Sequence, residues 1–144
     1  MLKLNNIEVR YSSVILVLKG VSLEVPDGSI IAMLGGNGAG KSTTLKAISG
    51  LLKTEEGEVT EGGIEFNGEQ IHKLNPEVIA RKGIIQVMEG GRSLEHLTVE
   101  ENLMAGAAVI PSRSTIKQDL EMVYGYFPKL KMLRKSTSGY ISGG

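Results

Sequence analysis

The stretch "GGNGAGKSTT", Gly35–Thr44, decides how this chain folds and what it binds. Its spacing from Gly35 to Gly40-Lys41-Ser42 matches the pattern G-x-x-x-x-G-K-[ST]. Backbone N–H groups can converge on one anion only where side chains leave room, and glycines provide that room. Lys41 adds a positive charge for the β- and γ-phosphates, and the Ser42 hydroxyl can ligate Mg²⁺. The stretch therefore predicts a site for a nucleoside triphosphate.

The residues on either side of this loop fit the same interpretation. "SIIAML", at 29–34, is a continuous apolar run and predicts a strand covered on both faces. Lys41–Ser49 predicts a helix that Gly50 ends. The competing interpretation, a glycine-rich turn with an incidental Lys-Ser pair, does not explain the spacing and both flanks together.

Composition limits the other possibilities. With 144 residues, 41% of them hydrophobic, the chain is expected to form one compact soluble domain or a large part of one. Sixteen basic and sixteen acidic side chains cancel, so no overall field favours nucleic acid or an anionic membrane. The chain contains no cysteine, which excludes disulfides and thiolate chemistry. No apolar run approaches the length needed to span a bilayer.

Further strands and turns are predicted from β-branched runs and turn residues. Strands are expected over 2–11, 14–20, 21–25 and 83–88, with a turn at 26–28. The segment 57–71 predicts a hairpin with Gly62-Gly63 at its tip.

Three more helices are predicted from their end signals and apolar spacing. One follows Asn75-Pro76 and ends before Gly83. A T-x-x-E capping box, Thr98 with Glu101, opens a second over 99–110. The third carries an apolar stripe that ends before Pro128 and consists of Ile116, Leu120, Val123, Tyr124 and Phe127. Because strands come first and helices last, we expect an α/β fold with a mixed-sheet nucleotide-binding core over 1–92 and a helical part over 93–144.

Kinases, GTPases and transport ATPases share such a phosphate loop, and other stretches distinguish among them. "LGGNGAGKSTTLKAISGLL", "IEFNGEQI", "NPEVIARKGIIQV" and "HLTVEENLMAGA" resemble, in the same order, the ATP-binding subunit of ABC transporters. The resemblance covers essentially the whole chain and is greatest to the branched-chain amino-acid importer group. It implies a P-loop NTPase core with an N-terminal antiparallel β part and the start of the ABC helical subdomain.

The resemblance also implies roles for individual residues. Tyr11 would stack on the adenine ring, although alone it would be interpreted as a half-buried strand tyrosine. Gln86 would reach Mg²⁺ or the attacking water, although alone it would be an ordinary polar residue at a strand end. Lys41 and Gln86 would be the catalytic residues, and Ser42 and Gln86 the metal ligands. The phosphate loop would consist of Gly36, Asn37, Gly38, Ala39, Gly40, Lys41, Ser42, Thr43 and Thr44.

The last residues, "ISGG", resemble the start of the ABC signature, with Ile141 in place of leucine. The resemblance implies that Ser142, Gly143 and Gly144 bind the γ-phosphate held by an opposite subunit. After Gln86-Val87, the sequence "MEGGR" at 88–92 departs from the Pro-Glu-Gly-Arg usual in the importer group. This departure concerns the loop that would face the transmembrane partner.

Hydrolysis in this family requires an aspartate at the end of an apolar strand, then a glutamate and a histidine. Neither Asp27 nor Asp119 ends such a strand. Glu89 could be a stand-in, but a solvated loop acid is the simpler interpretation, and His72 and His96 are expected at the surface or its boundary. We therefore expect this chain to bind nucleotide with little or no turnover.

The resemblance predicts the N-terminal part of an ABC importer ATPase subunit that uses ATP and Mg²⁺. Its partners would be a second ATP-binding subunit, transmembrane permease subunits and, indirectly, a solute-binding protein, with no nucleic acid. It would be cytoplasmic and peripheral on the cytoplasmic face of the inner membrane. The alternatives are a short non-enzymatic nucleotide-binding or regulatory module and, more remotely, another phosphate-loop enzyme such as a small kinase.

Overall fold

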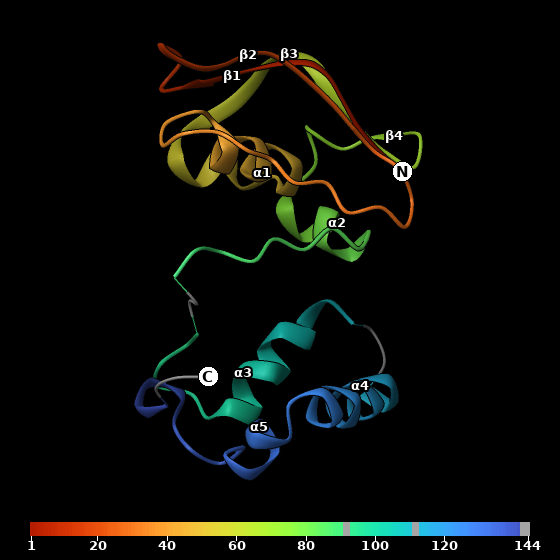
Figure 1. Cartoon of the computed structure of the whole chain (residues 1–144), viewed down its shortest axis with the longest axis vertical. Coiled ribbons are helices and arrows are strands. Elements are labelled where there is room, and N and C mark those ends of the chain that lie inside the picture. The colour runs from red at the N-terminus through yellow and green to blue at the C-terminus, as the bar shows by residue number, and fades with distance from the viewer. Residues whose placement is uncertain (91–92, 111–112, 142–144) are drawn as a thin grey trace. The chain divides into compact units, whose positions relative to one another are not determined.

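The structure is a computed structural model that describes residues 1–90, 93–110 and 113–141. The chain divides into two compact units, Met1–Gln86 and Val87–Gly144 (Figure 1). Within the described residues, no helix has the length and apolarity that crossing a membrane requires.

The first unit is built on an antiparallel sheet with the strand order β2-β1-β3-β4. Its strands are β1 (Leu2–Tyr11), β2 (Ile15–Val25), β3 (Gly57–Phe66) and β4 (Glu69–Gln70). The segments predicted separately over 14–20 and 21–25 are therefore one strand. The mixed sheet that we expected does not occur among the described residues, because every pairing in this sheet is antiparallel.

The predicted hairpin tip at Gly62-Gly63 is wrong. β3 runs through both glycines and pairs with β1 on either side of a bulge. Gly62 has φ +74°, and a Cβ there would lie 2.3 Å from the Asn5 carbonyl oxygen, so glycine is required for close backbone approach. The turn instead falls at Asn67-Gly68, both at positive φ, as an Asn-Gly hairpin turn requires.

Helix α1 (Lys41–Ser49) matches its predicted bounds and covers one face of the sheet (Figure 1). Gly50, in the left-handed conformation, ends it, and the 3₁₀ turn η1 (Leu51–Glu55) follows. The sheet, α1, η1 and α2 (Pro76–Arg81) enclose one apolar core. Its buried members are Leu4, Ile7, Val9, Leu18, Ala47, Ile48, Leu52, Ile64, Ile71 and Ile79.

Helix α2 also begins and ends as predicted. Asn75 occupies the N-cap position, Pro76 the first helical position, and Gly83 follows the end with φ +99°. The Asn75 side chain makes no capping hydrogen bond, so the helix start depends on the proline and on packing.

The predicted strands at 29–34 and 83–88 are absent from the structure. Both segments are irregular, and the side chains of Ile30 and Leu34 are 98% and 90% exposed. A strand buried on both faces requires neighbouring strands and covering layers, and in the described parts of the chain nothing pairs with either segment. Apolar composition alone was therefore insufficient to predict strand pairing.

The second unit is helical. It comprises α3 (Val99–Gly106), η2 (Ala107–Val109), α4 (Arg113–Tyr126), α5 (Pro128–Met132) and η3 (Ser138–Tyr140). Of the predicted stripe on α4, Tyr124 is buried, whereas Phe127 lies beyond the helix end and is 59% exposed. The stripe is therefore confirmed in its middle and wrong at its end, because α5 begins at Pro128 in a new direction.

The capping box of α3 is confirmed. The Glu101 N–H donates to the Thr98 hydroxyl oxygen, and the Thr98 N–H donates to the Glu101 carboxylate at 2.8 Å. Asn102, one residue further on, donates to the Leu94 carbonyl and accepts from the Leu94 N–H. The helix start is thus tied to the chain that precedes it.

Replacing Gly62 by alanine is expected to lower the free energy of unfolding by more than about 2 kcal/mol. The added methyl group would clash with backbone oxygens, and the positive φ at this position would also be unfavourable for alanine. Gly28 is the matched control: its φ is +70° but nothing lies within 4 Å of a Cβ there. Gly28→Ala should cost only about 1 kcal/mol. Urea unfolding followed by circular dichroism measures both, and equal losses would show that the close approach at Gly62 is unimportant.

The capping box should give α3 a dependence on pH. Hydrogen bonds from the N–H and then the hydroxyl of Thr98 hold the pKa of Glu101 below its ordinary value of 4.5. Because a lowered carboxyl pKa stabilises the folded state above the ordinary value, the contribution is lost as pH falls through the lowered pKa. The Thr98 amide resonance should follow this titration in NMR spectra, and Glu101→Gln should remove it. A midpoint above 4.5 would contradict the prediction.

Candidate functional site

The glycine-rich part of the phosphate loop, together with Gly35 before it, spans residues 35–40 and is held by its own backbone and by contact with the sheet. Gly38 and Gly40 have φ of +81° and +85°, and the Ala39 N–H donates to the Gly36 carbonyl at 3.3 Å. A Cβ at Gly40 would lie 2.4 Å from Leu18 Cδ2, so the loop rests directly on β2. Glycine at position 40 therefore serves both the turn and the packing.

The N-terminus of α1 can bind an anion through its first backbone N–H groups. Gly40 is its N-cap and supplies no side-chain hydrogen bond. The Thr44 N–H makes the first intrahelical bond, to the Gly40 carbonyl at 2.8 Å, so the N–H groups of residues 41–43 precede this ladder. Together with the helix dipole, they favour a negative group beside the loop.

Lys41 extends back over the loop. Its ammonium group donates to the Gly35 carbonyl at 2.6 Å and to the Gly36 carbonyl at 2.7 Å. The positive charge is therefore held beside the same backbone segment whose glycines leave room for phosphate oxygens. Loop, helix start and ammonium group converge on one small region.

Ser42 and Thr44 are oriented differently. Ser42 is exposed at the first turn of α1. Thr44 is 2% exposed, and its hydroxyl donates to the Gly40 carbonyl at 2.9 Å. Its hydroxyl thus fastens the loop to the helix and faces the interior, which leaves Ser42 as the hydroxyl available to a metal bound with phosphate.

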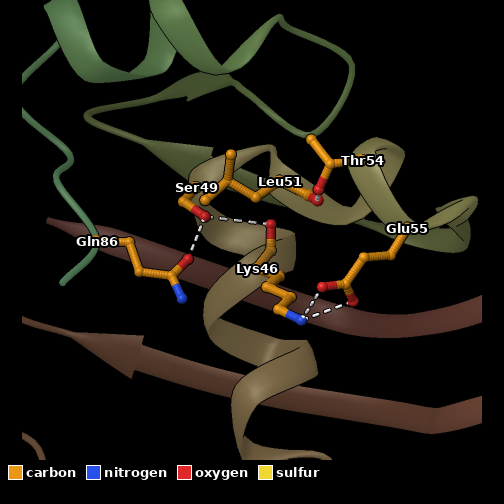
Figure 2. A network of polar contacts seen from close by, with 6 residues as sticks. All are labelled: Lys46, Ser49, Leu51, Thr54, Glu55 and Gln86. Carbon is orange, nitrogen blue, oxygen red and sulfur yellow. Dashed lines mark hydrogen bonds and ion pairs between the residues drawn. The ribbon is translucent and has the colours of Figure 1, made fainter. Parts of the chain in front are cut away.

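Gln86 is not brought to this region. The Ser49 hydroxyl, at the other end of α1, donates to Gln86 Oε1 at 2.5 Å (Figure 2). Ser42 and Ser49 are seven residues apart, which corresponds to about 10 Å along the helix axis. Of the two residues implied as metal ligands, only Ser42 lies beside the phosphate loop.

Tyr11 is the last residue of β1, which lies between β2 and β3 in the sheet. Val9, two residues earlier and on the same face of the strand, pairs with Leu18, which in turn contacts Gly40. The Tyr11 ring lies over Gly57, where a Cβ would be 2.8 Å from Tyr11 Cε1. The ring is half-buried and also packs against the apolar core.

The other acids and histidines are dispersed. Asp27 pairs with the N-terminal ammonium group of Met1, and Glu89 is exposed. His72 is half-buried, and its Nδ1 accepts a hydrogen bond from the Ile64 N–H at 3.3 Å. Over residues 1–90, 93–110 and 113–141, no group of three His, Cys, Asp or Glu side chains could hold a metal ion.

Ser142, Gly143 and Gly144, the signature residues implied by resemblance, lie outside the described residues. One contact of a candidate residue was not predicted from the sequence. Ser49, buried inside an ordinary helix, gives no local signal of its contact with Gln86, and only the pairing seen in the structure identifies it.

A phosphate-loop fold with these features is characteristic of nucleotide-binding cassettes, and the comparisons agree. The family model described as "ABC transporter" matches residues 18–144. The chain therefore belongs to the ABC transporter family.

Several relatives share much of the sequence. A high-affinity branched-chain amino acid transport ATP-binding protein, BraG of Pseudomonas aeruginosa, is 35% identical over the whole chain, which spans 59% of that protein. A probable branched-chain amino acid transport ATP-binding protein, LivF of Archaeoglobus fulgidus, is 34% identical over 89% of the chain and 52% of its own length. A phosphonates import ATP-binding protein, PhnC 2 of Synechococcus, is 40% identical over 74% of the chain and 38% of its own length.

Solved structures agree on the fold. A nucleotide-free ATP-binding cassette from an ABC transporter has a TM-score of 0.75 and 25% identity, and covers 99% of this chain and 59% of its own. An ATP-binding subunit of an ABC transporter has a TM-score of 0.75 and 29% identity, covering 99% of this chain and 56% of its own. The α/β P-loop NTPase class expected from the sequence is thus confirmed, for a chain that spans less than two thirds of these proteins.

Proposed function

We propose that this chain binds ATP with Mg²⁺ at the phosphate loop and belongs to the ATP-binding subunit of an ABC importer. The contact of the Lys41 ammonium group with the loop carbonyls at 35 and 36 carries the proposal. It keeps a cation beside the unpaired N–H groups that begin α1. A polyphosphate would exchange the two carbonyl contacts for charged oxygens, which bind an ammonium group more strongly.

Each residue of the site has a distinct part in this proposal. Lys41 would hold the β- and γ-phosphates, and the loop N–H groups would surround the oxygens. Ser42 would ligate Mg²⁺, which when bound neutralises charge on the phosphates. Tyr11 would stack on the adenine through the part of its ring that is not buried, because packing against Gly57 and the core already orders the side chain.

Coupling of ATP binding and hydrolysis to solute transport is part of the proposal for the whole protein. Two relatives whose names refer to branched-chain amino acid transport support that solute class. The phosphonate importer that also matches shows that the shared region recurs among importers of different solutes. The proposed partners are a second ATP-binding subunit and permease subunits. The proposed location is the cytoplasmic face of the inner membrane. We also propose that the γ-phosphate is bound by Ser142, Gly143 and Gly144. The expected core and helical parts, 1–92 and 93–144, remain our proposal for the domains.

Lys41→Ala should weaken ATP and ADP binding by roughly ten- to a hundred-fold, the range expected for a lost charged hydrogen bond. Isothermal titration calorimetry in Mg²⁺ measures the change. Lys53→Ala is the matched control, since Lys53 is an exposed lysine on η1, beyond the far end of α1. It should leave affinity unchanged.

Equal affinity in both lysine variants would overturn the assignment of the phosphate site. Phosphate release measured on the same samples tests the expectation of little or no turnover. Mg²⁺-dependent release that Lys41→Ala abolishes would contradict that expectation and leave the binding proposal intact.

Tyr11→Ala should weaken ATP binding by roughly five- to a hundred-fold, the range for loss of base stacking on an aromatic side chain. Tripolyphosphate, which has no base, should bind both proteins equally. Tyr11→Phe keeps the ring and should retain ATP affinity. If Tyr11→Ala weakens tripolyphosphate as much as ATP, the ring supports the loop and does not contact adenine.

A further inference from the structure

A cavity of about 200 Å³ lies in the first unit, lined by the end of α1, by η1, by the start of β3 and by the turn before α2. Its lining residues fall between 47 and 74, so the cavity is separate from the phosphate loop. We propose that this cavity binds a small organic anion, an aliphatic carboxylate, through Lys53 and Lys73. The inference goes beyond the proposed function and does not depend on it.

The two lysines bring positive charge to the cavity. Lys53 lies on η1 and Lys73 in the turn before α2, and both are exposed residues of the cavity lining. Within residues 1–90, 93–110 and 113–141, neither ammonium group has a hydrogen-bond or ion-pair partner. Two like charges beside one cavity repel each other, and a bound anion would remove that repulsion.

The acidic side chains in this region do not neutralise the cavity. Both carboxylate oxygens of Glu55, on η1, contact the Lys46 ammonium group at 2.6 Å (Figure 2). Glu58 belongs to the lining, but its neighbour Val59 packs against the core. Because side chains alternate along a strand, the Glu58 carboxylate lies on the other face of the sheet. The positive charge of the cavity is therefore retained.

His72 adds a hydrogen-bond donor. It is half-buried in the cavity lining, and its Nδ1 accepts a hydrogen bond from the Ile64 N–H at 3.3 Å. Since one nitrogen of a neutral imidazole accepts, the other nitrogen, Nε2, carries the proton and can donate to an anion. The C-terminal end of α1, at Gly50, contributes a negative partial charge of about half an elementary charge, which the two lysines exceed.

The rest of the lining is largely apolar and selects the kind of anion. Ala47 and Leu52 are buried, and Val59 and Leu74 pack against the same core. An aliphatic chain would cover this surface and gain hydrophobic stabilisation, whereas an inorganic anion would leave it in contact with water. The volume lies below the roughly 300 Å³ at which sites for drug-sized ligands begin, so a ligand of a few carbon atoms fits.

The experiment titrates the chain with 4-methylpentanoate and follows backbone amide resonances by NMR. Gly50 and Gly57 line the cavity, and their resonances should shift saturably, while those of Gly38 and Gly40 in the phosphate loop should not. The neutral 4-methylpentanamide has nearly the same shape and should bind about ten-fold more weakly, because charge-assisted hydrogen bonds are lost. Acetate has four carbons fewer and should also bind at least about ten-fold more weakly.

Variants test the two lysines. Lys53→Ala and Lys73→Ala should each weaken 4-methylpentanoate binding about three- to ten-fold, since exposed ammonium groups contribute less than buried ones. Lys19→Ala is the matched control, because Lys19 is an exposed lysine on β2 that does not line the cavity. It should leave the affinity unchanged. All three side chains are exposed, so each variant is expected to fold.

Several results would overturn the inference. These are the absence of saturable shifts at Gly50 and Gly57, equal affinity for the carboxylate and the amide, or unchanged affinity in both cavity variants. Inorganic phosphate that binds as tightly as 4-methylpentanoate would contradict the aliphatic carboxylate. Shifts confined to Gly38 and Gly40 would assign the anion to the phosphate loop instead. None of these results bears on nucleotide binding, which Lys41→Ala tests at the other end of α1.

Discussion

The close packing of Gly40 against Leu18 is the constraint on which the nucleotide site depends. Through this contact the phosphate loop lies directly against β2. Leu18 pairs with Val9 of β1, and both side chains belong to the buried core. A side chain at residue 40 would be strained at φ +85° and would require the Leu18 side chain to shift. The loop is therefore positioned by the antiparallel sheet as well as by its own glycines, which explains how a short exposed segment acquires a defined geometry.

Helix α1 connects the phosphate loop to a second region, around Gln86. Its first turn presents N–H groups, Lys41 and Ser42, while its last turn contacts Gln86 through Ser49. A helix is rigid over this length, so the two ends have a fixed separation. Gln86, which the resemblance implies in metal binding, therefore lies near the end of α1 that is opposite to Ser42.

Local signals predicted much of the fold. The phosphate loop, α1 with Gly50, the ends of α2 and the capping box at Thr98 depend on interactions between residues a few positions apart, so their sequences suffice to recognise them. The failures share a different cause. Segments 29–34 and 83–88 have the composition of buried strands, but strands form by pairing with distant segments, which composition does not reveal. Gly62 was interpreted as a turn because a bulge between β3 and β1 leaves the same local signature.

For the site, the sequence alone was enough to identify a phosphate-binding loop, its lysine and its hydroxyl. All the groups that bind phosphate and metal there lie within eight consecutive residues, Gly35–Ser42. Family resemblance added Tyr11 and Gln86 as candidates without a position for either. Folding then separated Gln86 from Ser42 and joined it to Ser49, a residue with no local mark of function. That contact links residues 37 positions apart in the chain. Such a contact depends on how α2 packs against the end of α1, and no short-range pattern encodes that packing.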